Sequence, residues 1–174
     1  MMPMNVLITG VQTVEKDSAV KLAVERLPAK GIRTMSFSDT KEGEGAEELG
    51  LLKRTQSRLI ENIQKRMLDS GRAHLIINGY CTISTRLGFV PVLTKEAAGI
   101  FRPSLVVCLE TDPRTVRGDA AAAFPEHQAV ERLFSVFIAS ECGAAVKFIR
   151  TGPDGAREAA EELAGILKEA LVAK

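Results

Sequence analysis

The fold of this chain is decided by its first strand and the turn after it, Asn5-Val6-Leu7-Ile8-Thr9-Gly10 followed by Val11-Gln12-Thr13-Val14-Glu15-Lys16-Asp17-Ser18. An apolar run that ends in glycine and enters a helix has the position of a phosphate-binding loop. A working loop, G-x-x-x-x-G-K-[ST], uses glycines to turn backbone N–H groups toward phosphate, lysine to reach the outer phosphates and a hydroxyl to hold magnesium. Only Gly10 and Lys16 occupy matching positions here.

Two carboxylates stand where that motif needs other chemistry: Glu15 replaces the second glycine and Asp17 replaces the hydroxyl. A carboxylate ~4 Å from a phosphate charge costs roughly 4 kcal/mol near a protein surface, about a thousandfold in affinity. In a first helical turn, however, acidic side chains are stabilised by exposed N–H groups and by the helix dipole. We therefore expect Glu15 or Asp17 to fill the anion-binding position, with Lys16 paired to these acidic neighbours. A capped, solvated helix start is the alternative.

Composition predicts one compact domain over residues 1–174, because 45% hydrophobic and 26% charged residues are sufficient for a three-layer core. A formal charge of +1 gives no field that favours nucleic acid or a membrane surface as partner. The apolar runs are too short for a membrane span and the N-terminus lacks the order of a secretory signal, so a cytoplasmic location is expected. Cys81, Cys108 and Cys142 fit no metal motif and are predicted to be free thiols, so no metal site is expected.

Short apolar runs alternate with helical patterns, which is typical of parallel strands joined by crossover helices. The predicted strands are 5–10, 34–37, His74–Asn78, Leu105–Glu110 and 146–150. One predicted helix follows the first strand, and the others cover 53–69, 126–142 and 156–173. The third of these four helices is expected to direct Val130, Leu133, Phe134, Phe137 and Ile138 inward. The helix at 53–69 has a basic outer face, which is the first surface to probe for a partner. Residues 38–50 and 80–91 are predicted loops at the carboxyl edge of the sheet, where ligands bind in such folds.

Several segments match one known family in order and spacing. Val6-Leu7-Ile8-Thr9-Gly10-Val11 is similar to a strand leading into G-V-P-G-V-G-[GK]-[TS]-T, and Arg102-Pro103-Ser104-Leu105-Val106-Val107-Cys108-Leu109-Glu110-Thr111 to a strand ending in V-E-T. Glu126-His127-Gln128 and Gly143-Ala144-Ala145-Val146-Lys147-Phe148-Ile149 also match. The chain thus resembles the archaeal-type adenylate kinases over nearly its whole length. The resemblance implies an α/β, three-layer P-loop kinase fold, with a five-stranded parallel sheet flanked by helices on both faces. It further implies a reduced monophosphate-binding segment at about 38–70, a short lid at about 113–125, and a homotrimer or other homo-oligomer.

The residues that differ from that family's pattern lie mainly at the positions that would bind magnesium and phosphate. The third strand ends Asn78-Gly79-Tyr80 where the family has Asp-Thr-His, so an amide replaces the acid that would organise magnesium. The lid keeps Arg114 and Arg117 but has alanine at 120–123, where the family has arginines. Phosphoryl transfer needs cations around the transferred group. This chain lacks the glycine cradle, the hydroxyl, the acid and the arginines at once. An active enzyme would need roughly 8 kcal/mol of transition-state stabilisation from other groups to replace them.

These departures predict an adenylate kinase-like pseudoenzyme with little or no phosphotransferase activity and no cofactor. It would act as a binding, regulatory or scaffold module for an unidentified protein partner or small ligand. The crevice retained for the ligand would include Arg54, Asn78, Tyr80, Arg86, Gly88 and Phe89. One alternative is an active nucleoside monophosphate kinase that uses Mg-ATP, with Lys16 on the phosphates, Ser18 as the hydroxyl, and Arg114 and Arg117 as clamps. Another is a nucleotide sensor that binds without turnover.

Overall fold

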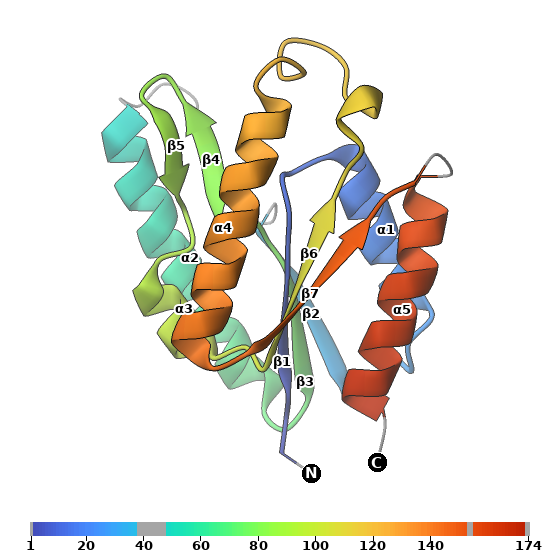
Figure 1. Ribbon diagram of the computed structural model, residues 1–174. Coiled ribbons are helices and arrows are strands. Elements are labelled where there is room, and N and C mark those ends of the chain that lie inside the picture. Colours follow the sequence, from blue (N-terminus) through green and yellow to red (C-terminus); the bar gives the residue numbers. More distant parts are fainter. Residues whose placement is uncertain (1, 38–47, 153–154, 173–174) are drawn as a thin grey trace.

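A computed structural model describes residues 2–37, 48–152 and 155–172 of the chain. Its centre is a five-stranded parallel sheet in the order β2-β3-β1-β6-β7 (Figure 1). The strands are β1 (Asn5–Thr9), β2 (Ile32–Ser36), β3 (His74–Asn78), β6 (Leu105–Glu110) and β7 (Ala145–Arg150). The central strand β1 pairs with β3 on one side and β6 on the other. The predicted parallel sheet is confirmed, and so is each of its five strands to within two residues.

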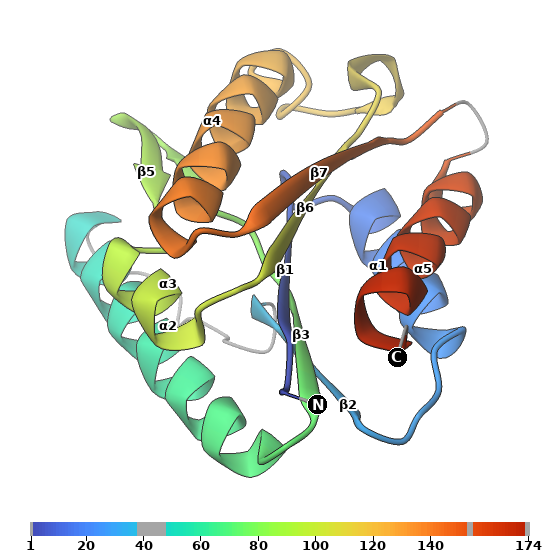
Figure 2. The same ribbon diagram turned by 60° about the horizontal axis from the view of Figure 1, so that its bottom comes forward.

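Helices cover both faces of the sheet. Helices α1 (Val14–Glu25) and α5 (Ala156–Val172) lie on one face, whereas α2 (Glu48–Ser70), α3 (Lys95–Phe101) and α4 (Phe124–Cys142) lie on the other (Figure 2). Side chains alternate along β1, so that Val6 and Ile8 pack with α1 and α5 while Leu7 packs with α2, α3 and α4. The predicted three-layer arrangement is therefore confirmed. No helix in the described ranges has both the length and the apolar composition of a bilayer span.

The segment predicted as a loop at 80–91 is instead largely an antiparallel hairpin of β4 (Thr82–Thr85) and β5 (Gly88–Pro91). The β-branched residues of β4 favour extended backbone, and Gly88 follows the two-residue turn with a φ of 118°. The hairpin packs against α4. Helix α3 was not predicted, because seven residues are too few for a clear periodic pattern. Residues 38–47 of the other predicted loop lie outside the described part of the chain.

The inward face of α4 differs from the prediction. Leu133 is 70% exposed and Phe137 is 47% exposed, whereas Glu131, Ser135 and Ile138 are buried. These three buried residues follow the i, i+4, i+7 spacing of one helix face. The polar members of this stripe were overlooked because apolar residues were used to locate the core. Their burial places a carboxylate beneath the carboxyl edge of the sheet.

Candidate functional site

The turn at the phosphate-loop position runs from Gly10 to Thr13. Gly10 has a φ of 129°, and a Cβ built there would lie 2.3 Å from the carbonyl oxygen of Leu109, so glycine is required. Thr13 is the N-cap of α1, and its hydroxyl accepts a hydrogen bond of 3.1 Å from the backbone N–H of Lys16. The helix start is therefore capped by its own side chain, as the alternative interpretation of this segment expects.

Lys16 points into the protein and not toward solvent. Its side chain is only 1% exposed, and Nζ donates to Asn78 Oδ1 at 2.8 Å and to the carbonyl oxygen of Gly79 at 2.6 Å. The expected direct pairing with acidic neighbours is thus wrong, since both partners are neutral groups at the end of β3. Burial lowers the pKa of Lys16 from its usual 10.5 to about 8, although the nearby charges of Asp17 and Glu131 favour the protonated form.

Asp17 belongs to a chain of polar side chains that joins the turn to β3. Its Oδ2 accepts a hydrogen bond from Gln12 Nε2 at 2.7 Å, and its Oδ1 accepts one from Asn78 Nδ2 at 3.1 Å. Asn78 therefore links Asp17 to Lys16. Both carboxylate oxygens of Asp17 are engaged by side-chain amides, and neither accepts a backbone N–H of the turn. Glu15, which is half-buried, and Ser18 form no hydrogen bond through their side chains within the described residues.

The carboxylate that meets the turn is that of Glu131, from α4. Glu131 is fully buried, with an exposed fraction of 0%. Its Oε1 accepts hydrogen bonds from the backbone N–H groups of Gly10 at 3.3 Å and Cys81 at 2.5 Å. Its Oε2 accepts from the N–H and hydroxyl of Thr82, at 2.9 and 2.7 Å. Sequence reasoning expected an internal carboxylate at this position but assigned it to Glu15 or Asp17. The missed signal is an acidic residue on the inward stripe of α4.

The two predicted lid arginines are not arranged around one centre. Arg114 is bound by Asp112, with Nη2 2.6 Å from Oδ2 and Nε 3.0 Å from each carboxylate oxygen. The hydrogen bonds from Arg114 lower the pKa of Asp112 from its usual 3.8 to about 2. Arg117 donates from Nη1 to the carbonyl oxygen of Arg114 at 3.2 Å. Arg114 lines a cleft beside Glu110 and Arg150. Arg117 lines a different cavity, next to the turn.

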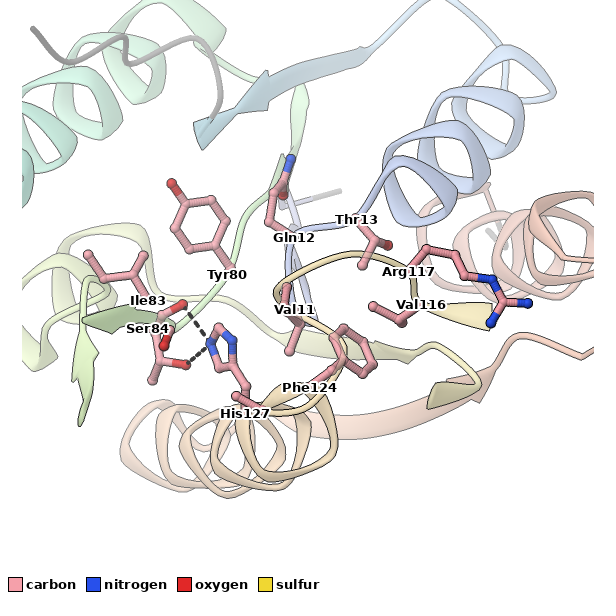
Figure 3. Close-up of a pocket in the computed structure, with 13 residues that line it drawn as sticks. Val11, Gln12, Thr13, Tyr80, Ile83, Ser84, Val116, Arg117, Phe124 and His127 are labelled. Carbon is pink, nitrogen blue, oxygen red and sulfur yellow. Dashed lines mark hydrogen bonds between the residues drawn. The ribbon is translucent and has the colours of Figure 1, made fainter. Parts of the chain in front are cut away.

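A cavity of about 460 Å³ lies between the turn, the β4–β5 hairpin, the lid segment and α4 (Figure 3). Its lining residues are Val11, Gln12, Thr13, Tyr80, Thr82, Ile83, Ser84, Val116, Arg117, Ala120, Ala123, Phe124 and His127. Most of the wall is apolar, and Arg117 is the only formally charged side chain among these residues. The cavity therefore borders the turn at the phosphate-loop position, with a mostly apolar wall and a single cationic side chain among its lining residues.

Few of the residues predicted to form a monophosphate crevice reach this cavity. Tyr80 lines it, and Phe89 lies behind its wall, stacked on His127 at a ring distance of 4.9 Å. Arg54 is directed along α2, where Nε donates to the carbonyl oxygen of Gly50 at 3.3 Å. Arg86 and Gly88 lie at the turn of the hairpin, and Asn78 is engaged with Lys16. In the part of the chain that the structure describes, no three His, Cys, Asp or Glu side chains could hold a metal ion.

Comparison with known proteins identifies relatives over the whole chain. The adenylate kinase of Methanoculleus marisnigri is 27% identical over 196 residues, covering 97% of this chain and 100% of the relative. The adenylate kinase of Thermococcus kodakarensis is 27% identical, covering 95% of this chain and 96% of the relative. The chain is a homologue of the archaeal adenylate kinases. No protein-family model matches it.

Solved structures of low sequence identity share the P-loop fold of this chain. A GTPase from Pyrococcus abyssi in its apo form matches with a TM-score of 0.52 and 14% identity, covering 91% of this chain and 71% of the other. A de novo designed P-loop fold protein matches with a TM-score of 0.51 and 14% identity, covering 98% of this chain and 96% of the other. At such low identity these structures show the P-loop fold alone.

Two of the residues that depart from the adenylate kinase pattern are joined to one another in this homologue. Asp17 and Asn78 are hydrogen-bonded together, and Asn78 holds the lysine of the turn. A magnesium-bound triphosphate fits these residues poorly, because Glu131 accepts the Gly10 N–H and Lys16 is buried.

Proposed function

We propose that this protein is an adenylate kinase-like protein with little or no phosphotransferase activity, acting as a binding, regulatory or scaffold module. The observation that carries the proposal is the Glu131 carboxylate bound to the Gly10 N–H at 3.3 Å, which places a buried negative group against the turn that a phosphate-binding loop would present to an anion. Gly10 is the glycine that the motif retains. Its N–H is already used within the protein.

The charge around the turn supports the same conclusion. Three carboxylates, those of Glu15, Asp17 and Glu131, accompany one ammonium group, that of Lys16. Each phosphate charge placed ~4 Å from an uncompensated carboxylate costs roughly 4 kcal/mol at an effective dielectric of about 20, about a thousandfold in affinity. Lys16 can offset one negative charge, but its contacts with Asn78 and Gly79 would have to break before it could reach a ligand. The turn is therefore electrostatically unsuited to a triphosphate.

The lid segment offers little compensation. The Arg114 guanidinium is neutralised by its bidentate contact with Asp112, and residues 120–123 are alanine. Cationic clamps stabilise the charge that develops on a transferred phosphoryl group, and loss of one electrostatic donor typically costs ~3 to 4 kcal/mol in the transition state. Arg117 alone would have to supply what several cations provide in an active kinase.

The test is a coupled assay with ATP, AMP and magnesium, beside calorimetry with Mg-ATP. We expect no turnover above the buffer background and no saturable heat. A variant in which Glu15→Gly, Asp17→Thr and Glu131→Gln are combined serves as the matched comparison, because these changes restore the motif and remove the three negative charges around the turn. Saturable Mg-ATP binding that appears only in this variant would support the proposal.

The competing function is an active nucleoside monophosphate kinase, which is favoured by the name adenylate kinase that the relatives carry over their full length. It would use Lys16 on the phosphates, with Ser18 as the hydroxyl and Arg114 and Arg117 as clamps. Turnover by the unmodified protein that is lost in Lys16→Met would establish this function and reject ours. Ligand-dependent melting with Mg-ATP but no product would instead establish a nucleotide sensor.

A further inference from the structure

The neighbours of the neutral His127 ring determine which of its two nitrogens carries the proton. Thr82 Oγ1 donates its one proton to Glu131 Oε2 at 2.7 Å, so it can only accept at its 3.1 Å contact with His127 Nε2. The carbonyl oxygen of Thr82, 3.4 Å from the same nitrogen, is also only an acceptor. Both contacts require the proton on Nε2. In the neutral ring, Nδ1 is therefore a hydrogen-bond acceptor.

This acceptor belongs to the wall of the cavity. His127 lines the cavity, and Figure 3 shows its second ring nitrogen on the side of the ring turned away from the dashed hydrogen bonds. Nδ1 has no hydrogen-bond partner among the described residues. The ring is held in place by stacking on Phe89, with an interplanar angle of 22°, and by its contacts with Thr82. Such a fixed polar group in an apolar pocket determines the orientation of a ligand.

Arg117, the one cationic side chain among the described residues that line the cavity, is directed out of it. Figure 3 shows the Arg117 guanidinium extending away from the other labelled side chains, and Nη1 donates to the carbonyl oxygen of Arg114. Val11, Ile83 and Phe124 contribute apolar surface to the wall. The volume of about 460 Å³ lies within the range of small-molecule pockets, roughly 300 to 1,000 Å³. A mostly apolar wall that holds the fixed acceptor of His127 favours a neutral ligand over a polyanion.

We propose that this cavity binds an uncharged, largely apolar small molecule that donates an N–H or O–H hydrogen bond to His127 Nδ1. The inference rests on the proposed function, because it requires that a triphosphate not occupy the turn that forms part of the wall. It goes further by naming the ligand class and the residue that selects it. A ligand of equal shape without a donor leaves Nδ1 buried and unpaired, which weakens binding.

A pair of probes isolates this hydrogen bond. Indole carries an N–H donor, and benzofuran has nearly the same shape with an oxygen in its place. Titrations followed by ¹H–¹⁵N NMR should show indole binding about threefold to tenfold more tightly, the ratio expected for one net hydrogen bond. The chain contains no tryptophan, so the fluorescence of indole gives a second measurement of its affinity without a tryptophan background. Equal affinities for the two probes would overturn the proposal.

Substitutions test whether His127 causes the preference for indole and whether the probes bind in this cavity. His127→Phe keeps a ring against Phe89 but removes the acceptor, so the preference for indole should disappear while the benzofuran affinity stays within about twofold. Ala120→Phe should fill the cavity and abolish binding of both probes, whereas Ala122→Phe, in the same segment but outside the lining, should not. A preference retained in His127→Phe, or binding unaffected by Ala120→Phe, would contradict the assignment.

The proposal and the function on which it rests fail in different experiments. Absence of probe binding together with absence of turnover would overturn the ligand class and leave the proposed function standing. Turnover with ATP and AMP would reject the proposed function. It would also reject this inference if magnesium-bound ATP displaced indole from the cavity.

Discussion

Replacing Glu131 with glutamine changes one atom in the most connected buried group of the site. The carboxylate accepts hydrogen bonds from the N–H groups of Gly10, Cys81 and Thr82 and from the Thr82 hydroxyl. A glutamine has one acceptor oxygen, so its NH₂ group must face two of these donors. Each buried donor without a partner costs ~1 to 3 kcal/mol, so we expect Glu131→Gln to lower the free energy of unfolding by about 4 kcal/mol.

Urea unfolding followed by far-ultraviolet circular dichroism measures this loss. With a slope of about 2 kcal/mol per molar urea, the midpoint should fall by about 2 M while the slope itself is unchanged. Glu126→Gln is the matched control, because Glu126 is exposed in the first turn of the same helix and should cost at most about 1 kcal/mol. If the two variants were equally stable, the four hydrogen bonds would not be holding Glu131, and the argument from the occupied Gly10 N–H would fail.

Three further predictions concern single residues. The pKa of Lys16 is about 8 when folded against 10.5 for the ordinary side chain, so the unfolded chain binds more protons between these values. The free energy of unfolding of the unmodified protein minus that of Lys16→Met, measured by urea unfolding across pH, should therefore rise by about 3 kcal/mol from pH 8 to 10.5, whereas the same difference for the exposed control Lys21→Met should stay flat. The subtraction removes the opposing loss of stability from Cys81 and Cys108, whose pKa values are raised by burial. Gly10→Ala should lower the free energy of unfolding by about 3 kcal/mol, because the new Cβ adds backbone strain and overlaps the carbonyl oxygen of Leu109. Gly118→Ala is the control and should cost about 1 kcal/mol, because Gly118 has a positive φ but open space around it. Equal decreases in melting temperature for the two variants would contradict this explanation. NMR titration should place the Asp112 carboxyl near pH 2, and Arg114→Gln should raise that pKa toward 3.8; an unmoved value would rule out Arg114 as the cause.

The sequence predicted the elements whose signal is local. The strands His74–Asn78 and Leu105–Glu110 were predicted at their observed bounds, because a buried parallel strand is a continuous apolar run. The hairpin Thr82–Pro91 was missed, since β-branched residues mixed with polar ones near glycine and proline also fit a loop. The apolar pattern of the sequence therefore predicts the central sheet better than the connections around it.

The site was only partly predictable, for a different physical reason. Glu131 lies 121 positions from Gly10 and 50 from Cys81, and its partners are mainly backbone N–H groups that every residue except proline possesses. No motif marks such a contact. An acidic residue on a buried helix face was the available signal, and it indicates that some internal partner must exist. The electrostatic argument correctly required an internal carboxylate, but local sequence could not select it from the other acidic residues.

The anchoring of α4 has a mechanical consequence. The helix begins at Phe124, directly after the segment that would serve as a lid, and Glu131 fastens its second turn to the ends of β1 and β3. Opening and closing of such a segment requires a hinge that can rotate at its base. The hydrogen bonds of Glu131 connect three distant parts of the chain, so a closing movement that carried α4 along with the preceding segment would first have to break them.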